Sequence, residues 1–126
     1  MRTGFIGLAA FVAAASLGGA ANAAGDDTNA DVRCIVVALA LSQSQDDQVR
    51  SVAPAALMYF RGRIEGRSPN FDLEPAIIAA VQTMSPSSFA AESARCGGQL
   101  EIEGRTLKAI GEDLKAKADA TKPPAG

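Results

Sequence analysis

The sequence predicts an all-α protein: a small irregular bundle of about five helices, joined by one disulfide and preceded by a cleaved signal peptide. Three observations support this prediction. Apolar residues recur at helical spacing through most of the chain after residue 30, the first residues have the composition of an export signal, and the chain contains two cysteines.

The first 23 residues have the features of a signal peptide. Arg2 supplies a positive charge, residues 5–17 form an apolar run, and residues 21–23 (Ala-Asn-Ala) have the small-x-small form that signal peptidase accepts. We predict cleavage after Ala23 and a periplasmic or secreted protein. A membrane anchor is the alternative, but this run is short and rich in Ala and Gly, whereas a spanning helix needs roughly 20 strongly apolar residues. We therefore expect no stable membrane insertion after cleavage.

The remaining chain is expected to have three segments: a flexible leader at residues 24–30, a helical domain at residues 31–118 and a disordered tail at residues 119–126. The chain has 12 basic and 14 acidic residues, and its net charge is −2. This balance provides no dense basic face, so nucleic acid is not an expected partner.

The two cysteines, Cys34 and Cys96, predict one disulfide, because thiols pair in an oxidising compartment. The bridge would close a long loop and contribute roughly 4 kcal/mol to stability in the chain-entropy model. Two separate thiols are the disfavoured alternative. The spacing differs from C-x-x-C and the chain has no His, so neither a thioredoxin-like site nor an ordinary zinc site is predicted. No metal or cofactor is expected.

The first helix is expected to begin at Thr28, because Thr28 and Asp31 have the spacing of a capping box. Residues 35–37, Ile-Val-Val, could also form a strand, but the length of the segment and its Ala-rich flanks favour a helix. The predicted inward stripe of this helix consists of Val32, Ile35, Val36 and Leu39, widened by Val37 and Leu41.

The second helix, at residues 46–65, is expected to be the central one, with one apolar face for a core. Pro54 interrupts it, so the helix either kinks there or begins near Ala53. We favour the kink, because Val49 and Val52 continue the apolar pattern. The predicted stripe is Val49, Val52, Ala53, Ala56, Leu57, Phe60 and Ile64.

Three arginines, Arg61, Arg63 and Arg67, gather at the end of the second helix. They form a candidate patch for an anion or an acidic partner. The alternative is a solvated helix C-terminus, where cations interact favourably with the helix dipole. We favour the second interpretation, since single basic clusters are common at helix ends.

The C-terminal part of the chain is expected to contain three helices. The third covers residues 73–84 with Asp72 as its cap, and the fourth begins at Ser85-Pro86 and should break or bend at Gly97-Gly98. Residues 99–103 could be helical or extended. The fifth helix follows, and two sets of residues repeat in it every seven positions, which predicts an apolar stripe beside a groove for close approach. These sets are Leu100, Leu107 and Leu114, with Ile110 filling in, and Gly97, Gly104, Gly111 and Ala118.

No enzymatic activity is predicted. The chain lacks His, which removes the commonest general base and the ordinary catalytic triads. The serines around Ser85 are explained as a helix start, because Pro86 follows directly. The paired carboxylates lie at helix ends or on exposed faces, without the burial that would separate their pKa values.

The order of these features resembles that of the periplasmic acid-stress chaperones of the HdeA type. Proteins of that family are small, secreted and helical, with one disulfide. As in that family, Cys34 lies early in the first helix, Cys96 follows a Ser-Pro helix start, and a Lys-rich amphipathic helix at residues 107–117 closes the chain. The segment between the cysteines is longer here, and the acidic, Phe-rich sequence after the first cysteine is absent. The resemblance implies a homodimer that loosens in acid and binds unfolding clients through exposed apolar surface.

The sequence therefore predicts a non-enzymatic exported protein that binds other proteins, with an acid-stress periplasmic chaperone as the specific form that the resemblance implies. Two alternatives remain open. One is a small structural or interaction subunit of a cell-envelope complex. The other is a helical carrier of an apolar small molecule, with a cavity between the second helix and its neighbours.

Overall fold

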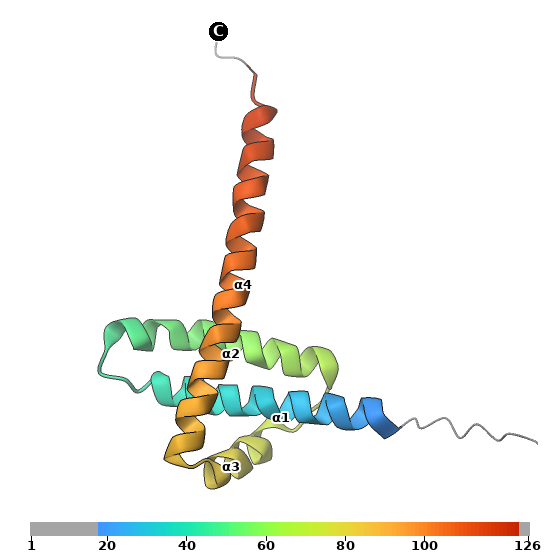
Figure 1. The fold of residues 1–126 in the computed structure, drawn as a ribbon, viewed down its shortest axis with the longest axis vertical. Helices are drawn as coiled ribbons and strands as arrows, with labels where there is room; N and C mark the ends of the chain where they lie inside the picture. The colour runs from blue at the N-terminus through green and yellow to red at the C-terminus, as the bar shows by residue number, and fades with distance from the viewer. Residues whose placement is uncertain (1–17, 124–126) are drawn as a thin grey trace, which may run out of the picture.

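The computed structural model describes residues 18–123, which form four helices and no strand (Figure 1). The all-α prediction is confirmed. α1 and α2 form an antiparallel pair, α3 lies against α1, and α4 crosses the pair steeply and extends away from it (Figure 1). Residues 1–17, which hold most of the predicted signal peptide, and residues 124–126 of the predicted tail lie outside the described residues. The helices are α1 (Gly18–Leu41), α2 (Asp47–Arg67), α3 (Leu73–Thr83) and α4 (Pro86–Ala120).

The body is built around α1, which contacts each of the other three helices. The sequence had suggested residues 46–65 for this central place. α1 also begins earlier than the expected start at Thr28 and includes the predicted flexible leader at residues 24–30. Four alanines between residues 20 and 24 explain the longer helix, because Ala has the highest helix propensity. Thr28 and Asp31 are inside the helix and buried, so they are not its capping box.

α2 begins as expected, with Asp46 at its N-cap accepting hydrogen bonds from two backbone N–H groups of the first turn. The helix continues through Pro54, so Val52 belongs to it and the alternative start near Ala53 is wrong. Val52 is nevertheless half exposed and contributes little to the core. The buried face of α2 consists of Ala53, Ala56, Phe60 and Ile64.

α3 covers the core incompletely. It is short and has no fully buried side chain. Asp72 occupies its N-cap position, but its side chain makes no capping hydrogen bond. The side chains that rest against the core from this helix are Leu73, Ala76, Ile77 and Ala80.

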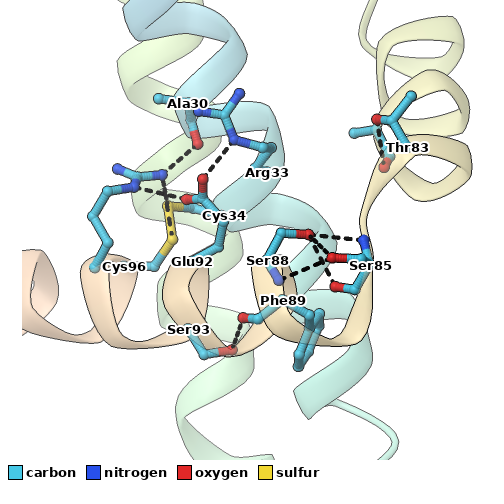
Figure 2. Close-up of polar contacts among 12 residues, drawn as sticks. Ala30, Arg33, Cys34, Thr83, Ser85, Ser88, Phe89, Glu92, Ser93 and Cys96 are labelled. Atoms are coloured by element: carbon cyan, nitrogen blue, oxygen red, sulfur yellow. Dashed lines mark hydrogen bonds and ion pairs between the residues drawn. A yellow bond between two sulfur atoms is a disulfide. The ribbon is translucent and has the colours of Figure 1, made fainter.

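α4 is one continuous helix, so a break at Gly97-Gly98, one of the two expected outcomes, is wrong, and residues 18–123 form four helices where about five were predicted. Glycine raises the free energy of a helix by roughly 1 kcal/mol but does not forbid it, and no described glycine adopts a positive φ. The contacts of Cys96 and Leu100 with the core hold the helix across this point. Ser85 caps its start and Pro86 follows at the first helical position, as predicted, and Ser88 completes a reciprocal capping box with Ser85 (Figure 2).

A disulfide between Cys34 and Cys96 joins α1 to α4, as predicted, with 5.6 Å between the two Cα atoms. Both residues belong to the core cluster, which is formed mainly by α1 and α2. Within residues 18–123, none of the helices is both long and apolar enough to cross a membrane. The buried cluster consists of Val32, Cys34, Ile35, Ala38, Ala56, Phe60, Ile64 and Cys96.

Candidate functional site

The C-terminal half of α4 projects from the body into solvent (Figure 1). Every residue from Gly104 to Ala120 is exposed, and at a rise of 1.5 Å per residue this segment is about 25 Å long. The helix therefore presents a surface that the described part of the chain does not cover.

An apolar stripe runs along this projecting segment. Leu107, Ile110 and Leu114 are 67%, 50% and 60% exposed, and we call these three residues the α4 stripe. At 100° per residue they lie within about 60° of one another. The stripe continues the face that carries Cys96 and Leu100, which pack on the body.

Small residues flank the α4 stripe on one side. The sequence predicted that Gly97, Gly104, Gly111 and Ala118 form a groove for close approach. A Cβ atom added at any of these three glycines would meet nothing within 4 Å, so no close approach of this kind occurs within the described chain. Packing inside the body does not explain these glycines, although each lowers helix stability by roughly 1 kcal/mol relative to Ala.

Ion pairs between side chains of α4 stabilise the projecting segment. Four Lys or Arg residues pair with an acidic residue four positions away, and both partners are exposed in every pair. Each such pair stabilises a helix by only a few tenths of a kcal/mol. The pairs are Glu101–Arg105, Lys108–Glu112, Asp113–Lys117 and Lys115–Asp119.

The predicted arginine patch is divided by the fold. Arg63 and Arg67 both turn towards Asp31 of α1, whose side chain is only 1% exposed. Arg63 Nε donates to Asp31 Oδ2 at 2.9 Å, and Arg67 Nη2 donates to the same oxygen. These two guanidiniums thus neutralise a buried carboxylate, a role that the sequence did not reveal because Asp31 was placed in a helix cap. Arg61 lies apart from them and pairs with Glu65 at 2.9 Å.

A chain of polar contacts links this cluster to α4. Arg63 Nη1 donates to the Tyr59 hydroxyl at 3.0 Å, and that hydroxyl donates to Glu103 at 3.3 Å. Burial acts to lower the pKa of Arg63, but the hydrogen bonds to Tyr59 and Asp31 and the charge of Asp31 outweigh it and hold the pKa above its ordinary value. The cation is therefore a fixed part of the α1–α2 interface.

A second charged cluster surrounds the disulfide (Figure 2). Glu92 accepts hydrogen bonds from Arg33 of α1 and from Arg95, each at 2.7 Å. Arg95 Nη2 also donates to the carbonyl oxygen of Ala30 at 2.7 Å and lies 3.0 Å from Cys34 Sγ. These contacts tie α4 to α1 beside the covalent bond.

The cluster lowers the pKa of Glu92. Burial acts in the opposite direction and would raise it, but the hydrogen bonds from Arg33 and Arg95 and the attraction of both guanidiniums are together stronger. Glu92 also lies within 4.8 Å of both sulfur atoms, a spacing compatible with metal ligation. Because the sulfurs are bonded to each other, they offer no thiolate to a metal in this state.

Two neighbouring hollows lie beside the C-terminal half of α2. One has a volume of about 530 Å³ and lies between the end of α2 and Phe71, and the other has a volume of about 270 Å³ and lies between α1, α2 and α3. Arg61 and Leu73 line both of them, and the exposed Met58 lines the second. Glu65, which pairs with Arg61, also lines the first hollow.

Comparisons of the chain with known protein families, with curated proteins and with solved structures found no match.

Proposed function

We propose that the protein is a non-enzymatic, exported protein that binds other proteins through the α4 stripe. The observation that carries this proposal is the exposure of Leu107, Ile110 and Leu114 along one face of a projecting helix. Amphipathic helices commonly bind by laying such a face, spaced at i, i+3 and i+7, into an apolar groove or against another helix. Contiguous exposed apolar surface on a small protein is typical of an interaction site.

The specific form that we propose is a periplasmic chaperone that acts under acid stress. Two carboxylates hold the helices of the body together through arginines: Asp31 joins α1 to α2, and Glu92 joins α4 to α1. Strong acid neutralises carboxylates, whose reference pKa values are near 4, and Glu92, whose pKa is lowered by Arg33 and Arg95, follows at lower pH and leaves these two arginines without their counter-charge. Self-repulsion of the positive chain then loosens the packing, and the disulfide limits the expansion. Such a state exposes additional apolar surface to an unfolding client.

Binding of envelope proteins at neutral and acid pH tests this proposal. The immobilised protein is compared with the Leu107→Glu variant and with a matched Ile102→Glu variant, because Ile102 is 55% exposed but lies on another side of α4. If the protein is a chaperone, it retains many different envelope proteins in acid. The Leu107→Glu variant loses this retention, and the Ile102→Glu variant keeps it. One constant partner at both pH values favours an envelope subunit. Equal retention by the protein and by Leu107→Glu contradicts binding through the α4 stripe.

The second candidate function is transport of an apolar small molecule, which the adjoining hollows at Arg61 and Leu73 favour. A molecule with an alkyl chain and an acid group could lie along Leu57, Met58 and Leu73 with its anion at Arg61. Native mass spectrometry of the freshly purified protein tests this alternative. A bound lipid or fatty acid that is lost in Arg61→Glu supports it, and a ligand-free protein argues against it.

A further inference from the structure

We propose that α3 is a flap, which unfolds locally at neutral pH while α1, α2 and α4 stay together. Its opening uncovers an apolar face of α1. This device goes beyond the proposed function, because it requires neither acid nor the α4 stripe.

No ion pair within residues 18–123 attaches α3 to the body. The ion pairs that join different helices there connect α1 to α2 and α1 to α4. The Thr83 hydroxyl donates to the backbone of its own helix, at Ala79 and Ala80. Asp72 at the N-cap makes no capping hydrogen bond. Apolar contacts are therefore the interactions that hold α3 in place.

The apolar contacts of α3 are loose. Ile77 and Ala80 rest against the core cluster, but no side chain of this helix is fully buried, and Ile78 and Val81 are about half exposed. Two hollows, with volumes of about 250 and 270 Å³, are each lined by residues of both α1 and α3 and share no residue. Such gaps remove van der Waals contacts that close packing would supply. Burial therefore stabilises α3 less than it stabilises α1 and α2.

A detached α3 does not remain helical. It has 11 residues, and isolated helices shorter than about 12–15 residues are marginal in water. Opening is therefore a local unfolding of the segment between Phe71, which packs on the core, and Ser85, which caps α4. Segments with few buried apolar contacts open at a lower free energy than the rest of a protein.

The other three helices are held together without α3. The disulfide between Cys34 and Cys96 and the ion pair between Arg33 and Glu92 join α1 to α4. Asp31 joins α1 to α2 through its two arginines. Opening of α3 leaves all of these contacts in place.

The surface beneath α3 is apolar. Val32 and Ile35 of α1 are 2% and 3% exposed, and each lines one of the two hollows beside α3. Leu39 lies on the same side of α1, because the three residues are spaced at i, i+3 and i+7. Opening of α3 thus exposes a continuous apolar face on α1.

Hydrogen exchange of the purified full chain at pH 7, with the disulfide intact, tests this opening. After correction for intrinsic rates, we expect the amides of residues 77–83 to exchange at least about a hundredfold faster than those of residues 34–38 and 56–60. Low concentrations of urea should change the α3 rates little, because local opening exposes less surface than global unfolding. Exchange of α3 as slow as that of the other two segments, or with the same urea dependence, would overturn the proposal.

Two core variants separate local opening from unfolding of the whole body. Ile77→Ala removes a contact that is lost on opening, so it should speed the exchange of α3 by about tenfold. Phe60→Leu weakens the packing among α1, α2 and α4, which persists when α3 opens. It should speed the exchange of residues 34–38 by about tenfold and leave the α3 rates unchanged.

Circular dichroism checks that both variants fold. If Phe60→Leu speeds the exchange of α3 and of residues 34–38 alike, α3 opens only together with the body, and the proposal fails. If Ile77→Ala leaves the α3 rates unchanged, apolar contacts do not hold the flap. Retention of clients through the α4 stripe does not depend on either result, so the two proposals can fail separately.

Discussion

The carboxylate of Asp31 on α1 lies 2.9 Å from Nε of Arg63 on α2, and it is almost completely shielded from solvent. Arg67 donates to the same oxygen. One buried acid thus connects α1 to α2 through two guanidiniums, each about a quarter exposed. The stability of the α1–α2 pair should depend strongly on this carboxylate.

Replacing Asp31 should destabilise the protein. In Asp31→Asn, the two arginines lose their shared counter-charge while remaining partly buried, and removing one partner of a buried pair costs about 3 kcal/mol or more. The free energy of unfolding, measured by urea denaturation, checks this. Asp119→Asn is the control, because its pair with Lys115 is exposed and should contribute less than about 1 kcal/mol. Equal, small effects would contradict a structural role for Asp31.

Phe60 and Arg61 are neighbours with opposite environments. The Phe60 ring is completely buried against the core, and the Arg61 side chain is 63% exposed. Phe60→Ala should therefore lower the free energy of unfolding by about 3–5 kcal/mol. Arg61→Ala should change it by less than about 0.5 kcal/mol. Similar losses for both, measured by thermal and urea unfolding, would mean that the buried face of α2 is assigned incorrectly.

The disulfide should contribute a large part of the stability. The Cys34→Ser, Cys96→Ser double variant should lose about 4 kcal/mol, because the unfolded chain regains the freedom of a long loop. Thiol labelling of the denatured, unreduced protein should find no free cysteine. Two labelled thiols per chain would show that the bridge does not form in the purified protein.

Stability should fall in acid partly through Glu92. Its pKa is lowered below the ordinary value of 4.5, so the folded state favours the ionised form. The stabilisation is fully present above the unfolded pKa and is lost as the pH falls through the folded value. We expect Glu92→Gln to be less stable than the wild type at pH 7, and this difference should shrink as the pH falls below about 4.5.

The exposed Glu74 provides the control for this pH dependence. Glu74 lies in the first turn of α3. At pH 7, the free energy of unfolding of Glu74→Gln should differ little from that of the wild type. Urea unfolding at a series of pH values gives the free energy of unfolding of the wild type and of both variants as a function of pH. A Glu92→Gln difference that stays constant from pH 7 into strong acid would contradict the role of the ionised carboxylate.

Much of the fold could be predicted from the sequence. The apolar pattern placed Phe60 and Ile64 on the buried face of α2, and the pairing of Cys34 with Cys96 followed from there being only two cysteines. Local signals at Ser85-Pro86 gave the start of α4. These features depend on periodicity and capping chemistry, which are local properties of the chain.

Other features depend on three-dimensional neighbours and could not be read from local patterns. Asp31 looked like part of a helix cap, because its partners Arg63 and Arg67 follow more than 30 residues later. The glycine pair at residues 97–98 looked like a helix break, because the contacts of Cys96 and Leu100 that hold the helix there come from the fold. The exposure of the α4 stripe could not be predicted either, because an apolar stripe on a helix normally indicates a buried face.

Light scattering of an acid-unfolded client protein tests the proposed function most directly. The purified protein, the Leu107→Glu, Leu114→Glu double variant and the Ile102→Glu control are each added at equimolar amount in acid. We predict that the protein and the Ile102→Glu control suppress aggregation of the client, and that the double variant does not. Absence of suppression by the protein, or equal suppression by the double variant, would contradict protein binding through the α4 stripe.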